Sequence, residues 1–163
     1  MIACMASVGR VERLWIDAQE WGLVRLDRLR AHRRRVNSTA PHLETGLRGE
    51  LAALFELRRR GIVIVARRWT SSKMRGDIDL IGWDGGQLCF IEVKTRTARD
   101  RTPAESAVDT HKRETLRGLA RAYLRTFPES ERSTIPMRFD VMSVYLLGAA
   151  TEFEFFQGTF AGS

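Results

Sequence analysis

Residues 76–96 read GDIDLIGWDGGQLCFIEVKTR, and this stretch decides the fold. Its two ends alternate charged and apolar residues with a period of two, which is the pattern of half-buried strands. The dipeptide Asp84-Gly85 lies between them, and Asp-Gly between two alternating runs is a strong hairpin signal. The stretch therefore predicts a β-hairpin.

Acidic side chains share one face of each predicted strand. A period of two places Asp77 and Asp79 on one face of the first strand, and Glu92 and Lys94 on one face of the second. The apolar residues that turn the other way are Ile78, Leu80, Ile91 and Val93.

The length of the turn decides whether the two charged faces coincide. A two-residue loop at residues 84–85 sets Asp77 opposite Glu92, and a four-residue loop at residues 84–87 sets Asp79 opposite Glu92. Both registers gather the three carboxylates and the lysine, whereas a three-residue loop scatters them. We therefore expect an acidic cluster.

Such a cluster is unfavourable unless a cation neutralises it. Two carboxylates about 5 Å apart repel by roughly 3 kcal/mol at an effective dielectric constant near 20. A divalent cation with oxygen ligands reverses that sign, and proteins usually hold Mg²⁺ with one or two carboxylates plus water and substrate phosphate. The arrangement predicts a metal site for Mg²⁺ or Mn²⁺.

The same residues resemble a known signature. Asp79, twelve residues and then Glu92-Val93-Lys94 are similar to the Asp…Glu-x-Lys pattern of restriction-endonuclease-like nucleases, the PD-(D/E)xK superfamily. The chain resembles the YraN-like family of predicted bacterial endonucleases, which is itself similar to archaeal Holliday-junction resolvases. The matching segments are Gly46-Leu47-Arg48-Gly49-Glu50, residues 76–81, residues 90–96, Ala107-Val108-Asp109 with Lys112, and Arg138-Phe139-Asp140-Val141.

The resemblance implies a set of roles. Metal ions would bind Asp79, Glu92, Glu50, Asp77 and the backbone carbonyl of Val93. Lys94 would orient the attacking water or stabilise charge on phosphorus, so the expected catalytic residues are Asp79, Glu92, Lys94 and Glu50. The basic residues around the hairpin add the expected nucleic-acid contacts Lys73, Arg75, Arg96 and Lys112, with ordinary solvation as the alternative for Lys73 and Arg75. Many resolvase-like nucleases are symmetric dimers, so a homodimer is expected. The family more commonly has Glu at the position of Asp77, and its His-containing ending is replaced here by Phe153-Glu154-Phe155-Phe156.

Two helices are expected around the hairpin. An apolar stripe predicts one over residues 43–60, with Glu50 inside the stripe and facing the sheet. A second is predicted over residues 110–127, with Asp109 as its N-cap. Extending its stripe back by one turn reaches Lys112, which then points toward the hairpin.

The remaining elements complete an α/β fold. Strands are predicted at residues 62–69 and 138–147, a last strand or docking tail at 152–156, and a basic loop at 70–75 that carries Lys73 and Arg75. Asp140 reads as a structural hydrogen-bond acceptor. This order predicts a central mixed β-sheet flanked by helices, which is also the restriction-endonuclease-like fold that the resemblance implies.

Residues 1–41 form a predicted basic amphipathic extension before a nuclease-like domain at residues 42–163. Residues 1–40 hold eight Lys and Arg residues against four Asp and Glu residues, and helical spacing predicts one or two helices. The extension would pack on the domain or a partner, form a partly disordered tail, or act as a basic arm that contacts DNA. Residues 37–41 are the expected linker.

Composition narrows the class of protein. The chain has 163 residues, 44% of them apolar, and no apolar run approaches the roughly 20 residues of a membrane helix. The expectation is a cytoplasmic protein with no membrane partner. Cys4 and Cys89 lack the spacing of a zinc site or a disulfide framework. The net charge of +7 favours a phosphate-backbone partner.

The leading hypothesis is a metal-dependent endonuclease that hydrolyses DNA phosphodiester bonds, on branched DNA in repair or recombination. One alternative is a catalytically inactive nucleic-acid-binding or scaffolding protein with a nuclease-like fold. The other is a structural role, in which Lys94 and Arg96 neutralise the acids on a salt-bridged, solvated sheet face.

Overall fold

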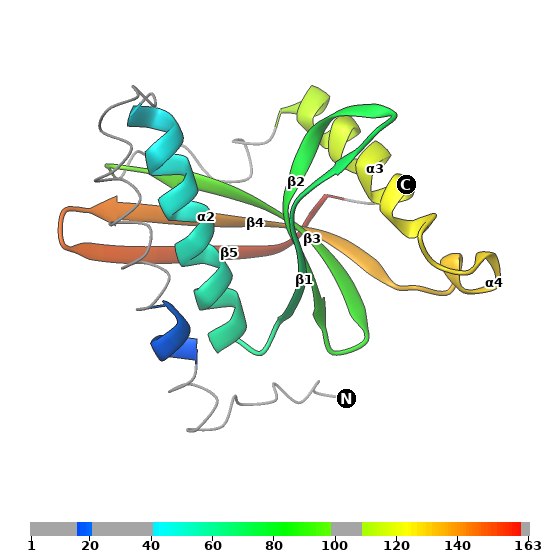
Figure 1. Cartoon of the computed structure of the whole chain (residues 1–163), viewed down its shortest axis with the longest axis horizontal. Coiled ribbons are helices and arrows are strands. Elements are labelled where there is room, and N and C mark those ends of the chain that lie inside the picture. Colours follow the sequence, from blue (N-terminus) through cyan, green and yellow to red (C-terminus); the bar gives the residue numbers. More distant parts are fainter. Residues whose placement is uncertain (1–15, 21–40, 99–108, 161–163) are drawn as a thin grey trace.

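A mixed five-stranded sheet forms the centre of the molecule. The computed structural model describes residues 16–20, 41–98 and 109–160. Figure 1 shows the order of the elements along the chain. They are α2 (Pro41–Arg59), β1 (Val63–Ser71), β2 (Met74–Asp84), β3 (Gln87–Arg96), α3 (Thr110–Leu124), α4 (Glu129–Arg132), β4 (Met137–Leu147) and β5 (Ala150–Phe160).

The spatial order of the strands is β1-β2-β3-β4-β5. β1, β2 and β3 form an antiparallel meander, β3 and β4 are parallel, and β5 returns antiparallel to β4. The parallel pair requires a long crossover, which α3 provides. This arrangement confirms the predicted α/β class with a mixed sheet flanked by helices.

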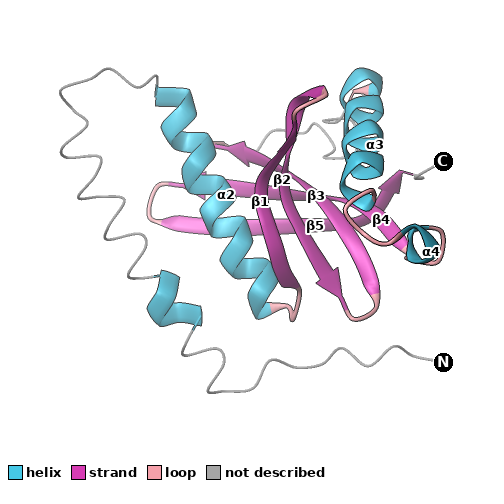
Figure 2. Ribbon diagram, turned by 45° about the vertical axis from the view of Figure 1, so that its right-hand side comes forward, coloured by secondary structure: helices cyan, strands magenta, loops and turns pink. Residues whose placement is uncertain are grey.

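The two long helices lie on opposite faces of the sheet, as Figure 2 shows. α2 contributes Leu51, Leu54 and Phe55 to one buried apolar cluster, and α3 contributes Leu116 and Leu119 to the other. The central strands are therefore covered on both faces, as the predicted sheet flanked by helices implies. Their middle residues are more buried than the half-buried strands that the alternation of charged and apolar residues indicates.

The hairpin register agrees with one of the two predicted alternatives. Trp83 pairs with Leu88 and Asp84 with Gln87, so the turn is Gly85-Gly86. Counting back along both strands places Asp79 opposite Glu92. This is the register predicted for the four-residue loop. The loop itself is shorter than predicted, because Asp84 and Gln87 also pair and leave a two-residue turn.

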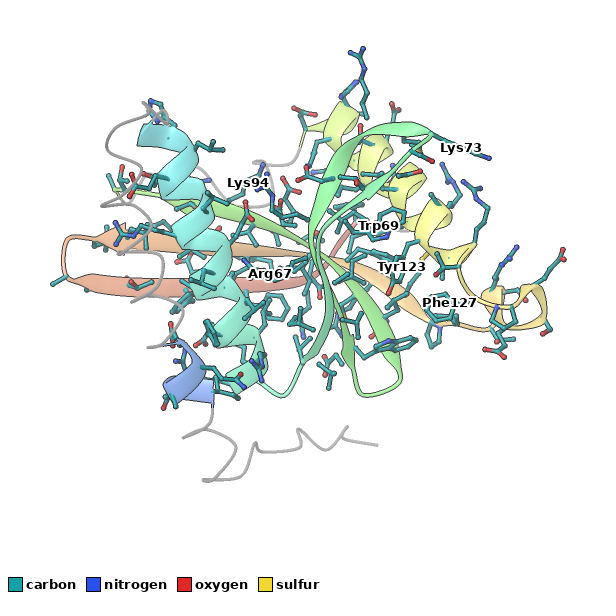
Figure 3. The ribbon with its side chains drawn as sticks, in the orientation of Figure 1. Arg67, Trp69, Lys73, Lys94, Tyr123 and Phe127 are labelled. Carbon is teal, nitrogen blue, oxygen red and sulfur yellow. The ribbon has the colours of Figure 1, made fainter. Side chains whose placement is uncertain are left out.

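The predicted orientation of the Ile78 side chain is wrong. Leu80 packs in the cluster under α2, but Ile78 packs in the cluster under α3. Its register partner Trp69 lies edge-on against Tyr123 of α3, with ring centroids 5.4 Å apart (Figure 3). The alternation of β2 therefore breaks at Asp79, where the β1–β2 hairpin bends toward α3.

Two predicted boundaries also change. Residues 70–75 were expected to be a loop, but Ser71 pairs with Met74, so β1 and β2 close in a tight hairpin. The helix expected to reach Phe127 ends at Leu124. Its end lies ahead of Pro128, which disfavours helical backbone in the residue before it.

A short helical segment at residues 16–20 packs against α2. Ile16 is buried in the cluster under α2, and Asp17 and Glu20 both accept hydrogen bonds from Arg59. This contact matches the predicted packing of the extension on the domain. The other predicted features of the extension lie outside the described residues. The exception is Pro41, the last residue of the expected linker, which is instead the first residue of α2. None of the described helices is long and apolar enough to cross a membrane.

Candidate functional site

The candidate site lies where β2 and β3 separate. Their pairing ends at Leu80 and Ile91, although both strands continue beyond this point. Figure 1 shows the β1–β2 hairpin turning toward α3, while β3 runs on past α2. In the fork, Asp79 Oδ2 accepts a hydrogen bond of 2.7 Å from the backbone N–H of Val93. The Asp79 carboxylate thus satisfies a strand donor close to where the pairing ends.

Glu92 is the most buried acid of the site. Its residue is 4% exposed, and each of its carboxylate oxygens meets a lysine. Oε1 lies 3.0 Å from Lys94 Nζ, and Oε2 lies 3.0 Å from Lys112 Nζ. Lys112 therefore points inward from the first turn of α3, as predicted. That turn is held by Asp109, whose carboxylate caps the helix by accepting from the Lys112 N–H at 2.7 Å.

α2 brings Glu50 to the same place. The preceding residue, Gly49, is buried, and a Cβ on it would lie 1.8 Å from Thr95 Oγ1 of β3. A glycine is needed for this close approach of helix and strand. Glu50 Oε2 is buried, and no described residue donates a hydrogen bond to it. Its cationic neighbour is Arg68, with Nε at 3.8 Å.

Arg68 also reaches Asp77, and the sequence analysis missed it. Its Nε lies 3.8 Å from Asp77 Oδ2, so one guanidinium connects acids from α2 and β2. The only signal in the sequence is the pair Arg67-Arg68 after the apolar start of β1. The four predicted acids, Glu50, Asp77, Asp79 and Glu92, are thus interacting neighbours in the structure.

The electrostatics of the cluster favour added positive charge. Burial and the Glu92 charge raise the pKa of Asp79 to about 7. Burial, assisted by the charges of Asp77 and Glu92, also raises the pKa of Glu50 despite the opposing charge of Arg68. Burial alone would lower the pKa of Lys112, but its interactions with Glu92 and Asp79 raise it overall. Asp79 and Glu50 therefore hold their protons more tightly than isolated carboxylates do.

A cleft of about 730 Å³ opens onto the cluster. Three of the predicted acids, Glu50, Asp79 and Glu92, line it together with Val93 and Arg96. The lining residues that the sequence analysis did not name as site residues are His42, Thr45, Gly46, Thr95, Thr97 and Ala98. Gly46 lies one turn before Glu50 on α2, so helical spacing from a recognised acid is the signal that would have found it.

Two predicted nucleic-acid contacts lie away from this cleft. Lys73 occupies the turn of the β1–β2 hairpin and points outward in Figure 3, whereas Lys94 lies between α2 and that hairpin. Arg75 is exposed near the same turn and is not part of the cleft lining. The structure therefore brings Arg96 and Lys112 to the acid cluster, but not Lys73 or Arg75.

The donor set fits a hard divalent cation. Glu50, Asp77, Asp79 and Glu92 offer carboxylate oxygens, which Mg²⁺ and Mn²⁺ prefer. The buried Glu50 Oε2, which receives no hydrogen bond from the described residues, has capacity for such a ligand. Within residues 16–20, 41–98 and 109–160, no three His, Cys, Asp or Glu side chains lie close enough together to hold a metal ion. In this arrangement lysines and an arginine contact the acids.

A second charged group beyond the cleft is structural. Arg138 Nε lies 2.9 Å from Asp140 Oδ2, and Arg138 also reaches Asp84 at 2.8 Å. Asp140 accepts a further hydrogen bond from the Gly158 N–H. These contacts tie β5 and the β2–β3 turn to β4. They match the interpretation of Asp140 as a structural acceptor.

Known proteins resemble this chain across the site. The model of the uncharacterised protein family UPF0102 matches residues 49–144. A UPF0102 protein of Koribacter versatilis is 53% identical over 105 residues, covering 64% of this chain and 71% of the relative. One of Solibacter usitatus is 44% identical over 112 residues, covering 69% and 82%. One of Porphyromonas gingivalis is 37% identical over 107 residues, covering 66% and 75%. The matched region contains Glu50, Asp79, Glu92, Lys94 and Lys112.

Proposed function

Because the chain belongs to UPF0102, an uncharacterised protein family, we propose its function from its site: a metal-dependent endonuclease that hydrolyses DNA phosphodiester bonds. Membership agrees with the predicted YraN-like family, and placement in the PD-(D/E)xK nuclease superfamily is part of the proposal. One observation carries it. Carboxylates from α2, β2 and β3 line one cleft, and Lys94 contacts one of them, Glu92, in a chain with a net charge of +7.

The acids would hold the cofactor, Mg²⁺ or Mn²⁺. Asp79, Glu92 and Glu50 would be its carboxylate ligands, with Asp77 and the backbone carbonyl of Val93 completing the set. A divalent ion there would polarise the scissile phosphate and lower the pKa of a bound water. The hydrogen bond from the Val93 N–H fixes the Asp79 carboxylate in the fork, so this ligand needs little reorganisation.

Lys94 and Arg96 would act on the water or the phosphate, and Lys112 would act on Glu92. Lys94 lies 3.0 Å from Glu92, so its ammonium is already held beside the acids. There it would orient the attacking water or stabilise the negative charge that develops on phosphorus. Lys112 would keep Glu92 oriented from the opposite oxygen, and Arg96 would contact phosphate at the cleft wall.

The substrate and setting are finer parts of the proposal. The basic net charge supports a polyanionic partner. Branched DNA in repair or recombination, a cytoplasmic location and a homodimer follow from the resemblance or composition and stay predictions. Size-exclusion chromatography with light scattering tests the dimer.

One observation favours the structural alternative. Both oxygens of Glu92 already contact lysines, so the buried Glu92 charge is neutralised within an ion network of the protein itself. Such a network can stabilise the fold without any catalytic role. Thermal unfolding with added Mg²⁺ or Mn²⁺ separates the two cases, because a ligand that binds only the folded state raises its melting temperature.

The decisive experiment is cleavage of labelled duplex, single-stranded and four-way-junction DNA with Mg²⁺ or Mn²⁺. We expect metal-dependent cleavage by the wild type and a loss of about 100-fold or more in both Asp79→Asn and Lys94→Ala. Glu129→Gln, an exposed change on α4, should cleave like the wild type and controls for purification.

Failure would take a recognisable form. If no DNA is cut but wild type, Asp79→Asn and Lys94→Ala bind it equally, the catalytic assignment is wrong and an inactive nucleic-acid-binding protein is the better description. If metal neither stabilises the protein nor supports cleavage, the charged cluster is structural.

A further inference from the structure

Arg68 occupies an unusual backbone position beside the acids. Arg67 pairs with Leu80 and Trp69 with Ile78, so Arg68 lies across from Asp79. Its φ of 46° makes it the only residue other than glycine with positive φ in the part of the chain that the structure describes. Residues with a Cβ rarely adopt this left-handed conformation, and such strain concentrates at functional sites.

The guanidinium of Arg68 lies within reach of two acids. Nε lies 3.8 Å from Glu50 Oε2 and 3.8 Å from Asp77 Oδ2. These carboxylates come from α2 and β2, so Arg68 neutralises charges that two separate elements bring together. Its own side chain is 51% exposed and lies at the solvent side of the cluster.

The lysines of the cluster are held more firmly. Lys94 and Lys112 each approach Glu92 to 3.0 Å, and their side chains are 30% and 27% exposed. Arg68 is more exposed and its contacts are longer, so the ion pairs it forms are weaker and more strongly screened by solvent. Of these cations, Arg68 is the one that an incoming ion displaces most easily.

We propose that Arg68 is an exchangeable cation of the site. Without metal it neutralises Glu50 and Asp77. With a divalent cation bound by the acids, like-charge repulsion turns the guanidinium outward, where it contacts the phosphate backbone of a nucleic acid. This inference rests on the proposed function, and it adds a residue that couples metal binding to nucleic-acid binding.

If a metal ion displaces Arg68, removing the Arg68 charge should strengthen metal binding and weaken nucleic-acid binding. Arg68→Asn removes the competing charge and suits a positive φ. It should therefore bind Mn²⁺ more tightly than the wild type, by roughly two- to fivefold, the size of a partly exposed ion pair. Arg68→Lys keeps the charge and should bind Mn²⁺ like the wild type.

Titration calorimetry with MnCl₂ provides the first measurement. Arg121→Gln is the matched control, because it removes one positive charge from an exposed position of α3 about 13 Å along the helix from Lys112. Asp79→Asn shows whether Mn²⁺ binds at the acids. Thermal unfolding is measured first, and Arg68→Gly, which adopts positive φ freely, replaces Arg68→Asn if that variant does not fold.

The second measurement is the salt dependence of duplex DNA binding, with every protein carrying Lys94→Ala to suppress cleavage. With Mg²⁺ present, Arg68→Asn should reduce the slope of log K against log salt concentration by about 0.9, the loss of one phosphate contact. Without Mg²⁺ the slope should not change, because Arg68 then contacts the acids.

The outcomes separate the two proposals. If Mn²⁺ binds the wild type more tightly than Asp79→Asn, but Arg68→Asn binds it like Arg121→Gln, the exchange is wrong and the metal site stands. A slope that Arg68→Asn changes equally with and without Mg²⁺ also overturns the exchange. If the wild type binds Mn²⁺ no better than Asp79→Asn, the metal-dependent function fails, and the exchange fails with it.

Discussion

At the scale of single residues, the surroundings of Asp79 have opposing effects on the pKa of its carboxyl group. Its carboxylate accepts the Val93 N–H at 2.7 Å, which favours the charged form, while burial and the charge of Glu92 favour the protonated form. The second pair of effects is larger, and the pKa rises from 3.8 to about 7. Near neutral pH the Asp79 side chain therefore passes readily between its protonated form and the carboxylate form that can bind a cation.

This raised pKa predicts the pH dependence of stability without metal. Between about pH 4 and pH 7 the folded protein keeps a proton on Asp79 that the unfolded chain has released, so the free energy of unfolding should fall as pH rises and level off above pH 7. Asp79→Asn should lose this part of the slope. Urea unfolding at several pH values with a chelator measures it. Equal slopes in the two proteins would contradict the raised pKa.

At the scale of elements, the contact of α2 with β3 positions Glu50. A Cβ on Gly49 would clash with Thr95, whereas a Cβ on Gly46 of the same helix meets nothing within 4 Å. Gly49→Ala should therefore destabilise the protein by about 1–3 kcal/mol through overpacking. Gly46→Ala should stabilise it by up to about 1 kcal/mol through helix propensity. Urea unfolding of both variants measures the difference. Changes of the same sign would show that α2 can move away from β3 freely.

Local patterns predicted the elements well. The period of two and the turn, which depend on residues close in sequence, left two registers open, and the structure adopts the one that places Asp79 opposite Glu92. The cap of α3 by Asp109 is likewise a local effect. The inward position of Lys112 followed from the apolar stripe of its own helix.

Features that depend on distant contacts were not predictable in this way. Ile78 faces α3 because the β1–β2 hairpin bends at Asp79, and the packing of Trp69 on Tyr123 accompanies that bend. The positive φ of Arg68 has no sequence signal, since arginine does not favour that conformation. The site could therefore be predicted as a set of acids and lysines, but not the guanidinium between them.

At the scale of the whole molecule, the segment at residues 16–20 contributes to the cluster under α2. Ile16 is 5% exposed there, so Ile16→Ala should lower the free energy of unfolding by roughly 2 kcal/mol. Ala18→Ser, an exposed change in the same turn, should alter it by less than about 0.5 kcal/mol. Urea unfolding of the two variants measures both values. Equal values would mean that the segment adds nothing to stability.

The mixed sheet also has a consequence for how the chain folds. β1, β2 and β3 pair with their neighbours in sequence, but β4 joins β3 only after the chain has closed a long crossover, with Leu88 beside Met137. Closing that loop is entropically unfavourable before its contacts form, and high contact order slows folding. The meander should therefore form early and the β3–β4 pairing late. Asp79 and Glu92 would then face each other before α3 delivers Lys112, so during folding Glu92 would have only Lys94, the first of its two lysine partners.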